Sequence, residues 1–144
     1  MKRIFNTNYN HDSLDFGLFL LRVVAACFMM SHGYAKLTTA LTGAEIQFAD
    51  PIGVGVALSF YLAIFAEFFC SILLLLGLAT RLALLPLIVT MAVVVFLVHF
   101  HEGFQKMELP AMYLVTYVFL LFSGPGKYSI DSVISKNANR RRTF

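Results

Sequence analysis

The chain has few charged residues. Eleven Lys and Arg and eight Asp and Glu occur among 144 residues, so 13% of the chain is charged, whereas 59% is hydrophobic. A soluble domain of this length usually has about 25% charged residues. The charges also form short patches between long apolar runs. This composition excludes an ordinary soluble domain, predicts a multi-pass membrane protein and leaves too little polar sequence for a second domain.

Several kinds of catalytic and binding sequence are also missing. Cys27 and Cys70 form no C-x-x-C pair, so the chain has neither a thiol redox motif nor a disulfide framework, and both are expected as small packing residues. No nucleophile–base pair, phosphate-binding glycine loop or nucleotide fingerprint is present, so no residue is assigned to catalysis. The few basic residues do not indicate nucleic-acid binding, and no signal peptide is expected.

Four apolar runs are long enough to cross a bilayer, since about 20 helical residues span its hydrocarbon core. No period of short alternating segments indicates a β-barrel, so helices are the remaining spanning structure. We predict an all-α fold, an integral membrane four-helix bundle over residues 14–131. A polar segment, residues 1–13, precedes it, and a basic flexible tail, residues 132–144, follows it. The helices are expected at about residues 14–36, 55–78, 82–101 and 109–123, with Pro110 in the first turn of the last one unless that helix begins near Phe104.

The lysine and arginine residues predict the orientation of the bundle. With four spans, both termini lie on one side of the membrane, together with eight Lys and Arg, and only Lys36 and Lys106 lie on the other side. The positive-inside rule then places both termini in the cytoplasm, where the basic tail is expected to contact anionic lipid. The eight residues are Lys2, Arg3, Arg81, Lys127, Lys136, Arg140, Arg141 and Arg142.

Glu67 is the only charged residue between Asp50 and Arg81, and it lies near the middle of an apolar run. A lone carboxylate costs about 3 kcal/mol to place at the centre of a bilayer, so Glu67 needs a partner or a proton. Helical spacing puts small residues on its face, and small residues let another helix approach closely. This face is therefore expected to pack inward and to leave Phe65 and Phe69 for lipid. Its other residues are Ser59, Ala63, Ala66, Cys70 and Ser71.

The first helix has a matching face, which holds Arg22, Ala26, Met29, Gly33 and Lys36. Counted from the cytoplasmic end, Arg22 and Glu67 differ by about 7 Å along the membrane normal, and two long side chains can close that gap. We predict a buried Arg22–Glu67 ion pair. The pair either only holds two helices together or takes part in proton uptake or in polarising a bound headgroup.

Histidines gather at the predicted outer ends of two helices. His32 and Lys36 close the first helix, and His99, His101 and Glu102 close the third. These side chains are candidates for contact with a quinone carbonyl or a substrate headgroup. Haem or a metal is not expected, because His99 and His101 point about 200° apart on a helix. The alternative is that the histidines are ordinary interfacial residues with wet ring tips.

Five stretches in order resemble the DoxX family, and together they extend from about Leu14 to Asp131. They are Leu21–Leu37, which contains Arg22 and an H-G-x-x-K ending, then Phe48–Gly55, Phe65–Arg81, His99 and Gly124–Asp131. The positions that match the family are Arg22, His32, Gly33, Lys36, Glu67, Arg81 and His99.

The resemblance implies a small four-helix protein of a bacterial inner membrane and a component of a membrane oxidoreductase. Some members of the family are similar to the small subunit of a thiosulfate:quinone oxidoreductase. The expected function is therefore an accessory subunit of a quinone-linked system, which acts with a partner subunit if it is catalytic. Its expected partners are the lipid bilayer, a soluble redox protein and a second copy of the chain.

The resemblance also assigns residues and leaves alternatives. Together with the polar groups that gather at one rim, it makes His32, Lys36 and His99, with the neighbouring His101, the candidate quinone or substrate contacts, and a quinone is the cofactor that this reading implies. The absence of paired cysteines argues against direct disulfide chemistry. One alternative is a proton-coupled small-solute carrier that uses Glu67 as a gate. Another is a non-catalytic membrane scaffold.

Overall fold

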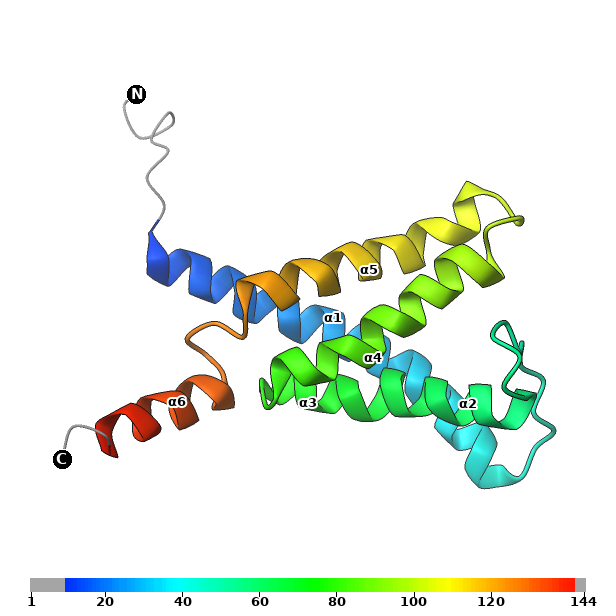
Figure 1. Cartoon of the computed structure of the whole chain (residues 1–144), viewed down its shortest axis with the longest axis horizontal. Coiled ribbons are helices and arrows are strands. Elements are labelled where there is room, and N and C mark those ends of the chain that lie inside the picture. The colour runs from blue at the N-terminus through cyan, green and yellow to red at the C-terminus, as the bar shows by residue number, and fades with distance from the viewer. Residues whose placement is uncertain (1–9, 142–144) are drawn as a thin grey trace.

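The computed structural model describes residues 10–141, with side chains to residue 138. Lys2, Arg3 and Arg142 lie outside this part, as do the side chains of Arg140 and Arg141, so the predicted contact of the basic tail with lipid stays a prediction. The described residues form helices and no strand. Four helical rods run up and down beside one another, and a short helix follows them (Figure 1).

The rods contain both α-helical and π-helical segments. The first rod is α1 (His11–Thr42). The second is α2 (Val56–Ile64), the π-helical segment η1 (Phe65–Cys70) and α3 (Ser71–Leu76). The third is α4 (Thr80–Val93) with the π-helical segment η2 (Val94–Val98), and the fourth is α5 (Phe104–Ser123). All four are long and apolar enough to cross a membrane, which confirms the predicted fold class.

Several helix boundaries differ from the expected ones, and the largest shift is at the end of α1, which lies at Thr42 and not near residue 36. α1 begins at His11 rather than near residue 14, because the Asn10 side chain accepts the Asp12 N–H at 3.0 Å and caps the helix. α5 begins at Phe104, so Pro110 lies inside the helix and not at its start. The segment expected as a flexible tail forms a helix, α6 (Ile130–Arg141).

The rods form two helical hairpins that are packed closely at one end only. α1 packs on η1 and α3, α4 packs on α5, and η1 and α3 connect the hairpins through contacts with α4. The hairpins converge at the end that carries both termini and diverge at the other end (Figure 1). The converging end holds most of the core, including Leu74, Leu84 and Leu87, which have no exposed surface.

Gly33 brings α1 and η1 into close backbone contact. A Cβ atom at Gly33 would lie 2.6 Å from the carbonyl carbon of Glu67 and 2.6 Å from the Phe68 nitrogen, so the two backbones touch there. The two predicted packing faces meet along this line. On α1, Ala26 and Met29 are at most 2% exposed, which confirms that the expected face of the first helix packs inward.

The face of Glu67 is buried as predicted. Glu67 is 4% exposed, and the five other residues on its face are also buried, whereas Phe65 and Phe69 are about half exposed. The helical period therefore identifies both sides of this rod correctly. The buried residues are Ser59, Ala63, Ala66, Cys70 and Ser71 with Glu67 itself.

Arg22 fastens the loop after α5 to α1 at the converging end. Its guanidinium is 1% exposed and donates to the Pro125 carbonyl at 2.8 Å and to the Tyr128 carbonyl at 2.6 Å. Gly77, which ends α3 with φ of 67°, lies directly against this guanidinium, and a Cβ there would collide with it. Arg22 is therefore level with the turn between α3 and α4, and the first turns of α1 run beyond that turn (Figure 1).

Asp131 joins α6 to the start of α4. Its carboxylate accepts the Ala79 N–H at 2.8 Å and the Thr80 N–H at 2.9 Å, and its own N–H donates to the Gly77 carbonyl at 2.9 Å. A carboxylate at this position satisfies two free N–H groups of the helix and complements its dipole. Burial alone raises the pKa of Asp131, but the hydrogen bonds from Thr80 and Ala79 outweigh burial and lower it.

Replacing Gly33 with Ala tests the backbone contact. We expect Gly33→Ala to lower the free energy of unfolding by about 1–3 kcal/mol, because neither backbone can move away without opening the packed face. Thermal unfolding in detergent measures the loss. Gly17→Ala is the matched control on the same helix, since nothing lies within 4 Å of a Cβ there, and it should be neutral or stabilising. Equal effects of the two changes would contradict the contact.

Replacing Asp131 with Asn tests the cap of α4. The lowered pKa means that the carboxylate stabilises the fold above its unfolded pKa of about 3.9, and that this stabilisation is lost as the pH falls through the lower folded value. Asp131→Asn should therefore cost about 1 kcal/mol at pH 7 and progressively less below pH 4. Thermal unfolding across pH measures this, with the exposed Ser135→Ala as a control. A loss that is independent of pH would rule out the ionised cap.

Candidate functional site

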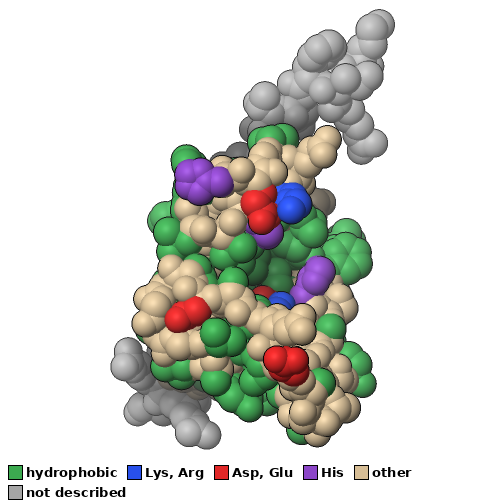
Figure 2. All heavy atoms as spheres, turned by 90° about the vertical axis from the view of Figure 1, so that its right-hand side faces the viewer, with side chains coloured by type: hydrophobic (Ala, Val, Ile, Leu, Met, Phe, Trp, Pro, Cys, Tyr) green, Lys and Arg blue, Asp and Glu red, His purple; other side chains and the backbone are tan. Residues whose placement is uncertain are grey.

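A cleft of about 570 Å³ separates the two hairpins at their diverging end. Figure 2 looks onto this end of the molecule, which is hollowed in its middle, with basic and acidic atoms visible at the bottom of the hollow and histidine side chains beside it. Sites for small molecules are typically about 300–1,000 Å³. The cleft therefore has the size of a ligand site.

The walls of the cleft are mainly apolar, and its polar groups come from all four rods. α2, α4 and α5 contribute apolar side chains such as Leu62, Val89 and Leu109, and the loop between α1 and α2 contributes Phe48 and Ile52. An apolar pocket with a few convergent polar groups is the usual composition of a small-molecule site. The polar groups are His32, Lys36, Ser59, Glu67, Thr90, His99 and Tyr113.

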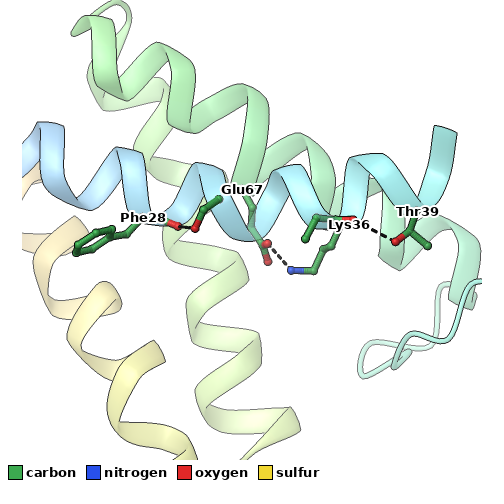
Figure 3. Close-up of polar contacts among 6 residues, drawn as sticks. Phe28, Lys36, Thr39 and Glu67 are labelled. Carbon is green, nitrogen blue, oxygen red and sulfur yellow. Dashed lines mark hydrogen bonds and ion pairs between the residues drawn. The ribbon is translucent and has the colours of Figure 1, made fainter. Parts of the chain in front are cut away.

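Lys36 and Glu67 form an ion pair in the cleft. The Lys36 ammonium donates to Glu67 Oε2, and the two side chains point toward each other from α1 and η1 (Figure 3). The Glu67 side chain is 6% exposed and that of Lys36 is 25% exposed, so the carboxylate is deep and the ammonium faces the open cleft. A bound ligand can therefore approach the ammonium directly.

This pair corrects the partner that the sequence predicts for Glu67. Gly33 lies against the backbone of Glu67, and Arg22 precedes Gly33 by eleven residues, about 16 Å along α1. Arg22 therefore cannot reach Glu67 and bonds to the Pro125 and Tyr128 carbonyls instead. The depth estimate failed because α1 runs past the turn between α3 and α4, which places Arg22 closer to the end of the bundle than expected.

The predicted histidines are not all brought together. His32 on α1 and His99 at the end of η2 both line the cleft, from opposite hairpins. His99 Nδ1 lies 2.6 Å from Glu102 Oε2, and this contact, followed by the Lys106 ammonium, lowers the pKa of the Glu102 carboxyl. His101 is exposed, does not line the cleft, and packs edge-on against Phe100.

The loop between α1 and α2 forms one lip of the cleft and was not among the predicted site residues. Asp50 accepts the N–H groups of Val54 at 3.1 Å and Gly55 at 2.8 Å and the Ser59 hydroxyl at 2.8 Å. The bond from Ser59 is the main cause of the lowered pKa of Asp50. Asp50 thus fixes the loop on the start of α2, and an Asp followed by Pro and two glycines is the sequence signal of such a turn.

A π-helical segment lies in each of the two facing walls. Glu67 is inside η1, and η2 ends at His99, whose N–H donates to the Val94 carbonyl at 3.0 Å. π-Helical turns are rare and are frequent at functional sites. Both η1 and η2 lie beside polar groups of the cleft, which supports this end of the bundle as the site. Hydrophobic periodicity does not reveal them.

Tyr113 and Tyr117 on α5 form the back of the site. Tyr113 lines the cleft, and its ring stacks on that of Tyr117 with centroids 5.8 Å apart. Tyr117 has no exposed surface, and its hydroxyl makes no hydrogen bond within the described residues. Among the same residues, no group of three His, Cys, Asp or Glu side chains could hold a metal ion.

Comparison with known proteins identifies the family. Residues 17–100 match the DoxX family, so the match covers most of α1, the loop with Asp50, Glu67 and His99. The chain belongs to the DoxX family. The matched range contains every predicted site residue except His101. No solved structure matches the chain significantly.

Relatives of this DoxX protein are bacterial. It is 30% identical to an uncharacterized protein of Haemophilus influenzae over 126 residues, which are 83% of each chain. A second uncharacterized protein of that organism is 32% identical over 129 residues, 83% of this chain and 91% of the relative. An uncharacterized membrane protein of Mycobacterium tuberculosis is 37% identical over 86 residues, 50% of this chain and 53% of the relative.

A double-mutant cycle tests the Lys36–Glu67 pair in this DoxX protein. Lys36→Met leaves a buried carboxylate unpaired and should cost about 3 kcal/mol, whereas Lys36→Met with Glu67→Gln should cost clearly less than the sum of the single changes. Thermal or denaturant unfolding in detergent gives the coupling. The Arg22→Gln, Glu67→Gln cycle is the control and should be additive within about 0.5 kcal/mol. Coupling in the control cycle, with none in the first cycle, would instead support the Arg22–Glu67 pair that the sequence predicts.

Proposed function

We propose that this DoxX protein is a membrane accessory subunit of a quinone-linked oxidoreductase system and that it binds the quinone headgroup in the cleft. The observation that supports this most is the Lys36–Glu67 pair at the bottom of an apolar cleft of about 570 Å³. A quinone ring is flat and apolar and has two carbonyl oxygens that accept hydrogen bonds. The cleft offers complementary groups, with apolar walls for the ring and donors for the oxygens.

The chain's own residues would orient the headgroup. Lys36, held by Glu67, would donate to one carbonyl oxygen, and a protonated nitrogen of His32 or His99 from the facing hairpins could donate to the other. Tyr113 would pack against the ring from α5. A bound quinone supplies the two-electron chemistry, and a partner protein would supply the electrons. The two cysteines, Cys27 and Cys70, are free and are not part of this proposal.

The orientation belongs to the same proposal. The positive-inside rule places the converging end, with Arg81, Lys127 and Lys136, in the cytoplasm of a bacterium and the cleft toward the outer leaflet of the plasma membrane. A soluble redox partner would then reach the cleft from outside the cell or would act through the bilayer on the same pool of quinone. A second copy of the chain remains a further candidate partner.

One observation favours a second function, a proton-coupled carrier. Glu67 is a buried carboxylate in a membrane-spanning rod, and such groups mark proton pathways. The converging end argues against a carrier, because Arg22 and Asp131 fasten its loops across the bundle. A proton flux into proteoliposomes that is lost in Glu67→Gln would favour the carrier over the quinone subunit.

Fluorescence quenching tests quinone binding. The sequence contains no tryptophan, so Tyr113→Trp is a single reporter inside the cleft. Quinones quench tryptophan, and we expect saturable quenching by tailed benzoquinones or naphthoquinones. Phe119→Trp is the control on the same helix, since Phe119 is 50% exposed outside the cleft and should show only non-saturating collisional quenching. Non-saturating quenching of both reporters by both classes of quinone would reject the proposal.

A matched pair of double variants tests the role of the ion pair. Lys36→Met with Glu67→Gln removes the donor without leaving a buried charge, and it should raise the quinone Kd about tenfold, as expected for the loss of one charged hydrogen bond. The control, Lys127→Met with Asp12→Asn, removes an exposed lysine–carboxylate pair at the converging end, whose nitrogen and oxygen are 2.9 Å apart, and it should leave the Kd unchanged. An unchanged Kd in the first variant would exclude Lys36 as the headgroup donor.

A further inference from the structure

We propose that the ligand enters the cleft sideways from the bilayer, through a slot between α2 and α4, and that it is a long-chain amphiphile whose tail stays in the slot. This inference rests on the proposed function and adds the route and the chemical class of the ligand. It concerns the side of the molecule, whereas the hollow in Figure 2 opens at the end.

The edges of the slot are side chains that belong both to the cleft and to the lipid-facing surface. Leu62 and Phe65 line the cleft from the second rod and are 47% and 51% exposed, and Val89 lines it from α4 and is 61% exposed. Each continues a stripe of exposed apolar residues along its own rod. Leu58 and Leu85, one turn away on the two stripes, are also about half exposed but do not line the cleft. The cleft therefore extends to the lipid-facing surface between the two stripes.

The packing of the rods leaves the slot open. α2 packs on α1 and η1, whereas α4 packs on α5, η1 and α3. The contacts of η1 and α3 with α4 close the space between the hairpins toward the converging end. Above η1, α2 and α4 are held apart, and small or ring side chains such as Ala63 and Pro86 line the space. The slot thus begins where the packed core ends.

The chemistry of the slot differs from that of the cleft behind it. Leu62, Phe65 and Val89 at the edge carry no polar atom, and the charged pair of Lys36 and Glu67 comes only from α1 and η1 behind them. A small water-soluble solute has nothing to bond in the slot. An amphiphile satisfies both regions at once, because its headgroup can accept from Lys36 while its hydrocarbon chain lies among apolar side chains and lipid.

Obstructing the slot tests the route. In the Tyr113→Trp reporter, Leu62→Phe with Val89→Phe adds bulk at both edges, and Leu58→Phe with Leu85→Phe places two phenyl rings one turn away on the same stripes. We measure the rate of quenching in proteoliposomes by a benzoquinone with an isoprenoid tail and by the same headgroup without a tail. The first variant should slow the tailed quinone about tenfold and leave the tail-less one within about twofold. The second variant should change neither rate.

The outcomes separate this inference from the proposed function. Equal slowing of both quinones, or of neither, overturns lateral entry, while saturable quenching by either quinone keeps the quinone site. Leu62→Ala, with Leu58→Ala as its control, provides a second test that does not risk overpacking. It should speed quenching by the tailed quinone only, and an unchanged rate, or an equal change for both quinones, would also overturn lateral entry.

Discussion

The close approach of α1 and η1 at Gly33 is the contact on which the site depends. The two backbones touch there, and Lys36, three residues further along α1, is then in reach of the Glu67 carboxylate. An unpaired carboxylate at this depth costs about 3 kcal/mol, so the pairing permits a charge to persist among apolar walls. Any side chain at position 33 would push α1 away from η1, and this would also separate Lys36 from Glu67.

The two ends of the bundle are built for different tasks. At the converging end, Arg22 and Asp131 bond to backbone groups of loops and helix starts, so that end is held by directional contacts that do not depend on a second side chain. At the diverging end, the side-chain hydrogen bonds of Asp50 and His99 within the described residues stay inside their own hairpins. The cleft can therefore be wide without weakening the core, because little of the core lies above η1.

The sequence predicts much of this architecture. Apolar runs reveal the four spans, and helical period correctly identifies the inward faces that hold Ala26 and Glu67. The sequence does not predict how far one helix is shifted along another, because this shift depends on where each helix begins and on which residues make the contact. For this reason, the inward face of α1 was predicted correctly, but Arg22 was predicted as the partner of Glu67, whereas the partner is Lys36.

Loop and backbone features were less accessible to sequence reasoning. The π-helical segments have ordinary apolar composition, so no period distinguishes η1 and η2 from α-helix. Asp50 and Asp131 act through main-chain N–H groups, and a carboxylate in a loop does not show which N–H group it will meet. His32 and His99 both line the cleft, but His32 does not close its helix as expected, because α1 continues to Thr42. His101 lies beyond the last turn of η2.

The position of Asp131 has a practical consequence for anyone who shortens or fuses this protein. The residue belongs to the C-terminal helix, yet it caps a helix that starts fifty-one residues earlier and forms a wall of the cleft. Deleting the chain from Ile130 onward would therefore fray a transmembrane segment rather than trim an appendage. An affinity tag should therefore follow the whole of α6 and not replace this helix at the end of the last membrane-spanning rod.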